Sequence, residues 1–179
     1  MGKQLTEIPP KLQEFITQQK MFFVATAAQT GKINLSPKGM DSLRVLTPTK
    51  IVWLNLTGSG NETAAHIHAS NRMTLMFCAF DGNPLILRLY GTAKVYHERD
   101  AAFANYASLF PNALGARQFF ELDIDLVQTS CGFGVPLMSY QGERGLMEKW
   151  ALQKGEEGIK NYWRDKNQLS LDGLDTQIF

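Results

Sequence analysis

Residues 51–67 read Ile51-Val-Trp-Leu-Asn-Leu-Thr-Gly-Ser-Gly-Asn-Glu-Thr-Ala-Ala-His-Ile67, an apolar run followed by a polar, glycine-containing turn and a short helical segment. The run Ile51–Leu56 predicts a strand, and the residues from about Asn61 to Ala69 predict a helix. A helix N-terminus carries unpaired N–H groups and a partial positive charge, so this order is typical of a phosphate-binding turn. An ordinary capped turn with Ser59 or Asn61 as the N-cap explains the pattern equally well.

The same turn lacks two nucleotide-binding motifs. It contains no Gly-Lys-Ser or Gly-Lys-Thr, which a P-loop requires, and Thr63 stands where a dinucleotide fingerprint has its third glycine. Gly58 and Gly60 still allow an anion to approach the backbone closely. The candidate hydrogen-bonding side chains of the turn are Thr57, Ser59, Asn61 and Thr63.

Short apolar or alternating segments, bounded by Gly, Pro, Asn or Asp, continue on both sides of this stretch and predict a mainly β fold with flanking helices. Most connections are too short for a crossover helix, so we expect a largely antiparallel sheet with enough strands to close a small barrel. The expected strands are 22–27, 32–35, 42–46, 51–56, 73–80, 85–96 and 119–129, and the expected helices are 9–20, 61–69, 100–110 and 143–165.

A second informative stretch is Asn34-Leu-Ser-Pro-Lys-Gly-Met-Asp-Ser-Leu-Arg-Val-Leu46, which predicts a strand that breaks at Pro37 and Gly39 and then resumes. A break of this kind frees backbone groups that can pair with a planar heterocycle, while Lys38 and Arg44 could neutralise a phosphate. A plain bulge with two solvated basic residues is the alternative interpretation.

Other candidate residues carry weaker signals. Arg88 interrupts the apolar run 85–90, which predicts either a bound anion or a solvated strand face. His66 and His68 lie on different sides of a helix and His97 stands alone, so no metal site is expected. No residue is identified from the sequence as a catalytic acid or base, and the catalytic residues stay unknown.

Composition excludes several classes of protein. The chain has 179 residues, 44% of them hydrophobic, which predicts a single domain over 1–179 with an N-terminal helix at 9–20, a core at about 20–145 and a C-terminal helix and tail at 143–179. A formal charge of +1 gives no support to nucleic-acid binding. No apolar stretch is long enough to span a membrane, and Cys78 and Cys131 form no CxxC pair, so a cytoplasmic protein is expected.

Several short motifs follow one another in a fixed order along the chain. They are Phe23-Val-Ala-Thr-Ala27, the turn at Gly31, Ser36-Pro-Lys-Gly39, the segment Trp53–Ile67, Arg72-Met-Thr-Leu-Met-Phe77 and Tyr90-Gly-Thr-Ala93. This ordered series strongly resembles the pyridoxamine 5'-phosphate oxidase-related FMN-binding family. The resemblance covers about residues 20–145 and implies a six-stranded antiparallel split β-barrel of the FMN-binding type. It also implies a homodimer with two FMN molecules at the subunit interface.

The resemblance also implies a cofactor site. Ser36, Pro37, Lys38 and Gly39 occupy the strand that lines the flavin in this family, Thr57 faces the ribityl and phosphate side, and the expected binding residues also include Ser59. Asn61, Glu62 and Thr63 open the phosphate helix, where the oxidase itself has a serine followed by arginine and lysine. The phosphate charge must therefore be neutralised from elsewhere, and the candidates are Lys38, Arg44 and Arg88.

These implications favour an FMN-dependent oxidoreductase that exchanges a hydride or electrons with a small organic substrate or nicotinamide. A non-catalytic module that stores or senses a flavin or haem is the alternative, because the fold alone does not separate the two. The tail 149–179 lacks the Arg- and His-containing pattern expected of a true pyridoxamine phosphate oxidase, so the substrate and the electron acceptor stay open.

Overall fold

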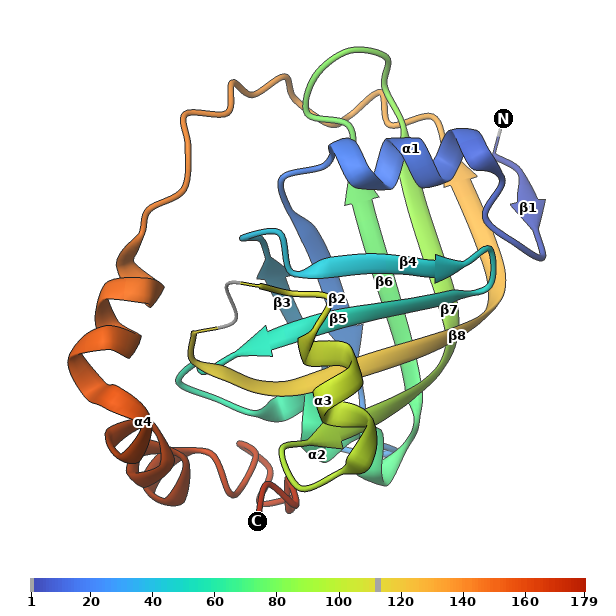
Figure 1. Cartoon of the computed structure of the whole chain (residues 1–179). Helices are drawn as coiled ribbons and strands as arrows, with labels where there is room; N and C mark the ends of the chain where they lie inside the picture. Colours follow the sequence, from blue (N-terminus) through green and yellow to red (C-terminus); the bar gives the residue numbers. More distant parts are fainter. Residues whose placement is uncertain (1, 112–113) are drawn as a thin grey trace.

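The structure, a computed structural model, describes residues 2–111 and 114–179. Within them, eight strands form one antiparallel sheet in the order β3-β2-β6-β7-β8-β5-β4, and β1 pairs with β8 beside this path (Figure 1). The elements in chain order are β1 (Gln4–Leu5), α1 (Pro10–Gln18), β2 (Phe22–Thr26), β3 (Asn34–Lys38), β4 (Leu43–Thr47), β5 (Lys50–Leu56), α2 (Glu62–Ala69), β6 (Arg72–Cys78), β7 (Ile86–His97), α3 (Ala101–Ala107), β8 (Ala116–Ser130) and α4 (Leu146–Lys166).

The long strand β8 joins the two halves of the sheet. It pairs with β7 from Ile86↔Ser130 to His97↔Gln118 and with β5 from Lys50↔Asp123 to Leu56↔Ala116. The sheet coils, so β4 and β5 cross in front of β2, β6 and β7 (Figure 1). The mainly antiparallel fold with flanking helices is confirmed, whereas the six-stranded barrel is not, because the sheet has eight strands and its pairing path is open at β3 and β4.

Strand β5 is buried on both faces, which explains its continuous apolar run. Ile51 and Trp53 point into the main core, where the Trp53 ring stacks on Phe120 at a centroid distance of 4.6 Å. Val52 and Leu54 point to the other face and pack in a cluster with side chains of α3. Residues from α1 and α2 complete the main core, and α1 lies across one end of the strands (Figure 1).

The region around Pro37 differs from the expectation. Strand β3 does not break at Pro37 but continues through it to Lys38, with Pro37 opposite Phe23. Strand β3 is an edge strand and, among the described residues, pairs only with β2 in the strand order. Its outer side therefore has no ladder of hydrogen bonds that the missing N–H of a proline could interrupt. The chain then turns at residues 39–42 into β4, so the break falls after the strand.

The C-terminal helix α4 lies apart from the sheet and is reached through the linker, residues 131–145 (Figure 1). It is kinked at Gly155, whose φ of 64° and ψ of 175° are not helical. Ala151, Ile159 and Trp163 of α4 pack with Ile178 in a separate cluster, so the tail folds back on the helix. No helix in the described part of the chain is long and apolar enough to cross a membrane.

Candidate functional site

A cavity of about 540 Å³ lies where β3, β5, the turn at 57–61, the start of α2 and the start of β8 meet. Six of the residues expected to bind the cofactor line it: Ser36, Lys38, Ser59, Asn61, Glu62 and Thr63. The remaining lining residues are Asn34, Asn55, Leu56, Gly58, Gly60, Arg117 and Leu171. We call it the cation cavity because of the two basic side chains that it contains.

Lys38 is the first of these cations. Its side chain is half-buried, and the Nζ atom lies 5.4 Å from the centre of the Trp53 ring. Burial, with a smaller contribution from the charge of Arg117, lowers the pKa of Lys38 from its ordinary value to about 8. The ammonium group therefore lies in a setting where a nearby anion would stabilise its charged form.

Arg117 is the second cation, and only 3% of it is exposed. Its Nη1 donates to Asn167 Oδ1 at 2.7 Å and to the Gly58 carbonyl at 3.4 Å, and its Nε donates to Gln118 Oε1 at 3.2 Å. Burial lowers its pKa to about 9. Within the described residues no carboxylate forms an ion pair with Arg117 or with Lys38, so neither cation has a direct anionic partner.

The start of α2 supplies neutral polar groups. Asn61 is the N-cap residue, yet its side chain makes no capping hydrogen bond, so the first-turn N–H groups keep their donor capacity. Its Oδ1 atom is buried without a partner, as is the Ser36 hydroxyl across the cavity. Buried polar atoms are usually hydrogen-bonded, so these two atoms suit a ligand that carries hydroxyl groups.

Asn34 and Thr63 are held in place by a hydrogen-bond network behind the cavity wall. Asn34 Nδ2 donates to Thr63 Oγ1 at 3.2 Å and to Thr26 Oγ1 at 3.3 Å. The Thr26 hydroxyl in turn lies 3.2 Å from Nδ1 of the buried His66. This network fixes the side chains that join β3 to α2.

Glu62 places a carboxylate in the cavity wall, but the tail engages it. Both carboxylate oxygens accept the Leu171 N–H at 3.1 Å. The carboxylate of Glu62, which stands where the oxidase has a basic residue, is thus hydrogen-bonded to a backbone N–H of the tail.

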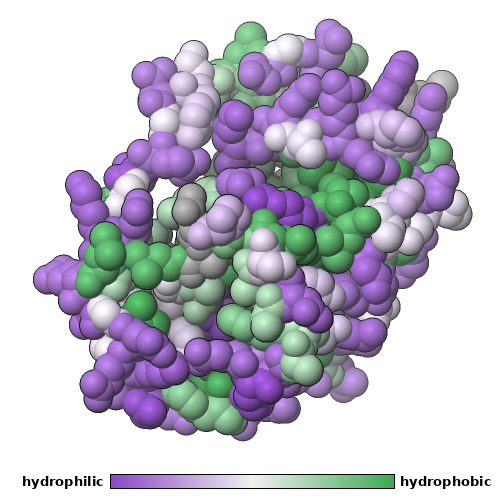
Figure 2. All heavy atoms as spheres, in the orientation of Figure 1, coloured by the Kyte–Doolittle hydropathy of each residue, from purple (hydrophilic) through white to green (hydrophobic). Residues whose placement is uncertain are grey.

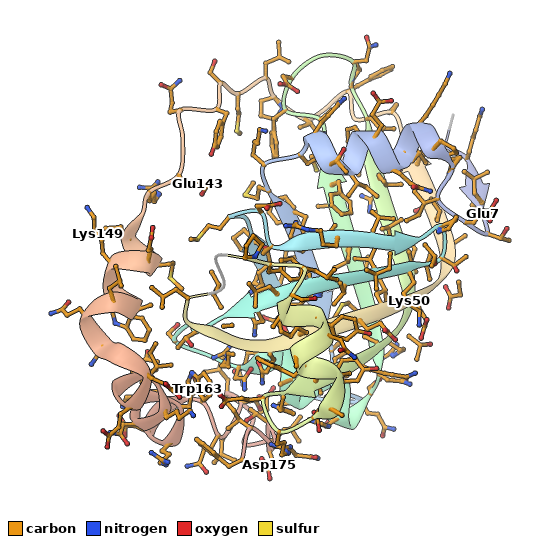
Figure 3. The ribbon with its side chains drawn as sticks, in the orientation of Figure 1. Glu7, Lys50, Glu143, Lys149, Trp163 and Asp175 are labelled. Carbon is orange, nitrogen blue, oxygen red and sulfur yellow. The ribbon has the colours of Figure 1, made fainter. Side chains whose placement is uncertain are left out.

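The segment after α4 closes the cation cavity from the other side. Asn167 has no exposed surface; its Nδ2 donates to the Gly58 carbonyl at 3.1 Å, and its carbonyl accepts from Asn61 Nδ2 at 3.2 Å. Trp163, on the face of α4 toward the sheet in Figure 3, donates from Nε1 to Thr57 Oγ1 at 2.9 Å. The turn 57–61 is therefore held by residues about a hundred positions further along the chain.

The structure does not bring every predicted residue to the cation cavity. Arg44 pairs with Asp41 through two contacts of 2.7 and 2.8 Å and lies over the Phe110 ring. Arg88 donates to Ser130 Oγ at 3.2 Å, and Thr57 is buried between Gly115 and Trp163. Pro37 and Gly39 line a neighbouring cavity instead. Lys38 is thus the one basic candidate of the three that lines the cation cavity.

Arg117 is the cation that the sequence analysis missed. The expected strand began at Phe119, whereas β8 begins at Ala116. Asn55 pairs with Gln118 and Leu56 pairs with Ala116, so Arg117 is the extra residue of a bulge. A bulge redirects a side chain locally, and this one turns Arg117 into the cavity. No signal in the sequence gives that register.

The sheet topology and the cavity define the class: a mainly antiparallel β protein in which two basic side chains and a helix N-terminus surround one polar cavity. The chain belongs to the pyridoxamine 5'-phosphate oxidase family, whose model matches residues 8–131. The family assignment expected from the motifs is therefore confirmed. Helix α4 and the tail lie outside the matched residues.

Comparisons with individual proteins agree with this assignment. The pyridoxamine 5'-phosphate oxidase family protein ustO of Aspergillus flavus is 37% identical over 183 residues, covering 91% of this chain and 73% of the relative. HupZ of Group A Streptococcus matches with a TM-score of 0.56 and 18% identity over 66% of this chain and 91% of its own. A Lactobacillus delbrueckii protein provisionally named a pyridoxamine 5'-phosphate oxidase matches with a TM-score of 0.54 and 21% identity. That match covers 69% of this chain and 94% of the Lactobacillus protein. These two structures show a shared fold.

Proposed function

We propose that the chain binds FMN in the cation cavity and is an FMN-dependent oxidoreductase. The observation that carries the proposal is the pair Lys38 and Arg117, two cations in one cavity without a carboxylate partner among the described residues. A phosphate group is the ligand chemistry that best compensates such a pair. The start of α2 adds N–H donors and a partial positive charge at the same place.

The polar wall of the cavity fits the remainder of the cofactor. The unpartnered Asn61 Oδ1 and Ser36 Oγ would accept or exchange hydrogen bonds with the ribityl hydroxyls. Since β3 is an edge strand, the N–H and C=O groups on its outer side between Ser36 and Lys38 would be available to form hydrogen bonds with the edge of the flavin ring. Each part of FMN thus has a matching set of protein groups.

The isoalloxazine of bound FMN would supply the electron-accepting chemistry, and the protein would bind and orient it. Lys38 and Arg117 would hold the phosphate end of the cofactor in the cation cavity. Trp53, beneath the Lys38 ammonium, and the buried strand β5 exclude water from this side. This role needs no catalytic acid or base from the protein.

The test is FMN titration of the protein stripped of cofactor, beside riboflavin, which lacks the phosphate. Lys38→Gln is expected to weaken FMN binding by about 10- to 100-fold, because a charge-assisted phosphate contact contributes about 1.5–3 kcal/mol. Arg44→Gln is the matched control, since Arg44 is paired with Asp41 outside the cavity. An equal loss in both variants, or no FMN binding by the wild type, contradicts the proposal.

Turnover separates the oxidoreductase from a binding module. The FMN-loaded protein should oxidise reduced nicotinamide, or reduce oxygen at the expense of a small organic substrate, faster than free FMN does. Tight FMN binding together with no turnover over a broad substrate panel would favour the non-catalytic module instead.

A further inference from the structure

A second and larger cavity, of about 720 Å³, lies next to the cation cavity. It is formed by the end of α1 and the start of β2, by the turn after β3, and by residues 138–147 of the linker and the start of α4. The space-filling view shows the surface hollowed between the linker and the body of the sheet (Figure 2). Lys38 lines both cavities, so the two are adjacent.

The composition of this wall is unusual. Four of the seven methionines of the chain lie in it, together with aromatic and aliphatic side chains. Methionine is flexible and polarizable, so methionine-rich walls adapt to apolar and aromatic ligands of varied shape. We call this the methionine cavity; its apolar lining residues are Met21, Met40, Phe80, Met138, Tyr140, Leu146 and Met147.

The turn that carries Met40 has an uncommon backbone. Met40 and Asp41 have φ values of 62° and 52°, a left-handed conformation that residues other than glycine rarely adopt. The turn is fixed by the Ser42 hydroxyl, which donates to the Gly39 carbonyl at 2.6 Å, and by the ion pair of Asp41 with Arg44. Such conformations cluster at ligand-binding sites, and here the strain directs a long apolar side chain to the cavity.

The opposite wall is attached to the sheet. The Met138 N–H donates to the Phe80 carbonyl at 2.8 Å, which holds the linker against the strand end. At this wall Tyr140 donates to Glu143 at 2.9 Å and Lys20 lies over the Tyr140 ring, and the charged residues Asp81 and Arg144 line the cavity as well. Figure 3 shows Glu143 on the linker, away from the sheet. Among the charged residues of this wall, Lys38 is the one that also lines the cation cavity.

We propose that the methionine cavity is the substrate site and that it takes a bulky apolar or aromatic organic molecule with a polar group directed toward Lys38. This inference rests on the proposed function, because the flavin would lie along β3 between the two cavities. A cavity of this size holds a ligand of drug-like dimensions. The methionine side chains of the wall predict tolerance for ligands of different shape.

The test uses 2-naphthol, a neutral aromatic probe that does not absorb where the flavin does, titrated into the FMN-loaded protein. We expect a saturable change in the visible flavin bands. Met138→Glu should raise the Kd of 2-naphthol about tenfold, because a carboxylate beside an apolar ligand must be desolvated. Leu169→Glu is the control: it places the same carboxylate at a tail residue that is 59% exposed and lines neither cavity.

The FMN affinity of each variant is measured in the same experiment. Weakened 2-naphthol binding in Met138→Glu alone, with FMN affinity unchanged, supports the inference. Equal 2-naphthol affinities in Met138→Glu and the wild type, or no flavin response at all, overturn it while FMN binding stands. Failure of the wild type to bind FMN overturns the proposed function and, with it, this assignment of the substrate.

Discussion

Arg117 and Asn167 form the contact that most directly controls the charge of the cation cavity. Arg117 is almost fully buried, and the amide oxygen of Asn167 holds its Nη1 at 2.7 Å without neutralising it. A carboxylate in place of the amide would pair with the guanidinium and remove its attraction for a phosphate. The neutral amide therefore keeps the arginine both oriented and charged.

Asn167→Asp should consequently weaken the binding of FMN by about tenfold or more, while it leaves the binding of riboflavin nearly unchanged. The measurement is the ratio of the two dissociation constants. Asn167→Ala removes the side-chain hydrogen bonds of Asn167, including the one from Arg117, and leaves the charge of Arg117 unpaired, so its ratio should change less. A parallel loss of FMN and riboflavin affinity in Asn167→Asp would show a general defect in folding and would contradict this role.

Lys38 predicts a pH dependence of FMN binding. Its pKa of about 8 lies below the ordinary value of 10.5, so the free protein loses this charge as the pH rises through about 8. A bound phosphate favours the ammonium form, and binding above that pH must take up a proton. The affinity for FMN should therefore fall between pH 8 and about 10. Loss of the Lys38 proton alone gives at most about tenfold per pH unit, and Arg117, whose pKa burial lowers to about 9, adds to the fall at the upper end. Titrations of riboflavin should be flat over the same interval, and Lys38→Arg should move the fall to higher pH.

Strand β8 is the element on which the two halves of the sheet depend. It pairs with β7, β5 and β1, and it carries Arg117 in its bulge against β5. A second irregularity lies on its other edge, where the register against β7 shifts between Tyr90 and Gly91. Gly91 belongs to one of the motifs that identified the family, and the structure gives a steric reason for a glycine there.

A Cβ atom at Gly91 would lie 2.0 Å from the carbonyl oxygen of Asp123, which belongs to the β8 backbone. Because backbone cannot move aside as a flexible side chain does, Gly91→Ala should lower the free energy of unfolding by about 1–3 kcal/mol. Urea denaturation measures this loss. Gly134→Ala is the control, since an added Cβ there meets no atom within 4 Å. Equal midpoints for the two variants would contradict the steric argument.

On the scale of the whole molecule, apolar side chains are exposed on the edge strand and on the linker. Ile33, which precedes β3, and Leu35, within it, are 78% and 64% exposed, and Phe133 and Leu137 of the linker are 81% and 80% exposed. Exposed apolar groups of this size, on the two sides of the proposed cofactor and substrate cavities, are typical of a surface that a partner covers. We propose a second copy of the chain as that partner.

Sedimentation should accordingly give about twice the 20.1 kDa of one chain. Leu35→Lys places a charge on the edge strand and should shift the equilibrium toward the monomer. Leu109→Lys is the control, because Leu109 follows α3 near the other end of the strand order and is 38% exposed. A wild-type monomer at micromolar concentration, or dissociation by both variants alike, would contradict a dimer through β3.

The sequence by itself determined the elements and the family. Apolar alternation and turn residues located nearly every strand and helix, because those signals act over a few residues, and the motifs between Phe23 and Ala93 identified the family. The same signals placed Lys38, Asn61 and Thr63 among the candidates. They could not distinguish Arg44 and Arg88 from Lys38, because which way a basic side chain faces depends on neighbours that the local pattern does not contain.

Only the tertiary structure decided the composition of the site. The bulge between β5 and β8 turns Arg117 inward, and the tail brings Asn167 to a turn more than a hundred residues earlier in the chain. The tail also contacts Glu62, because the Leu171 N–H donates a hydrogen bond to the carboxylate that stands at the start of α2 in place of a basic residue. These three outcomes depend on strand register and on contacts between distant segments. Such features are set by the packing of the whole chain and produce no periodic pattern in the sequence.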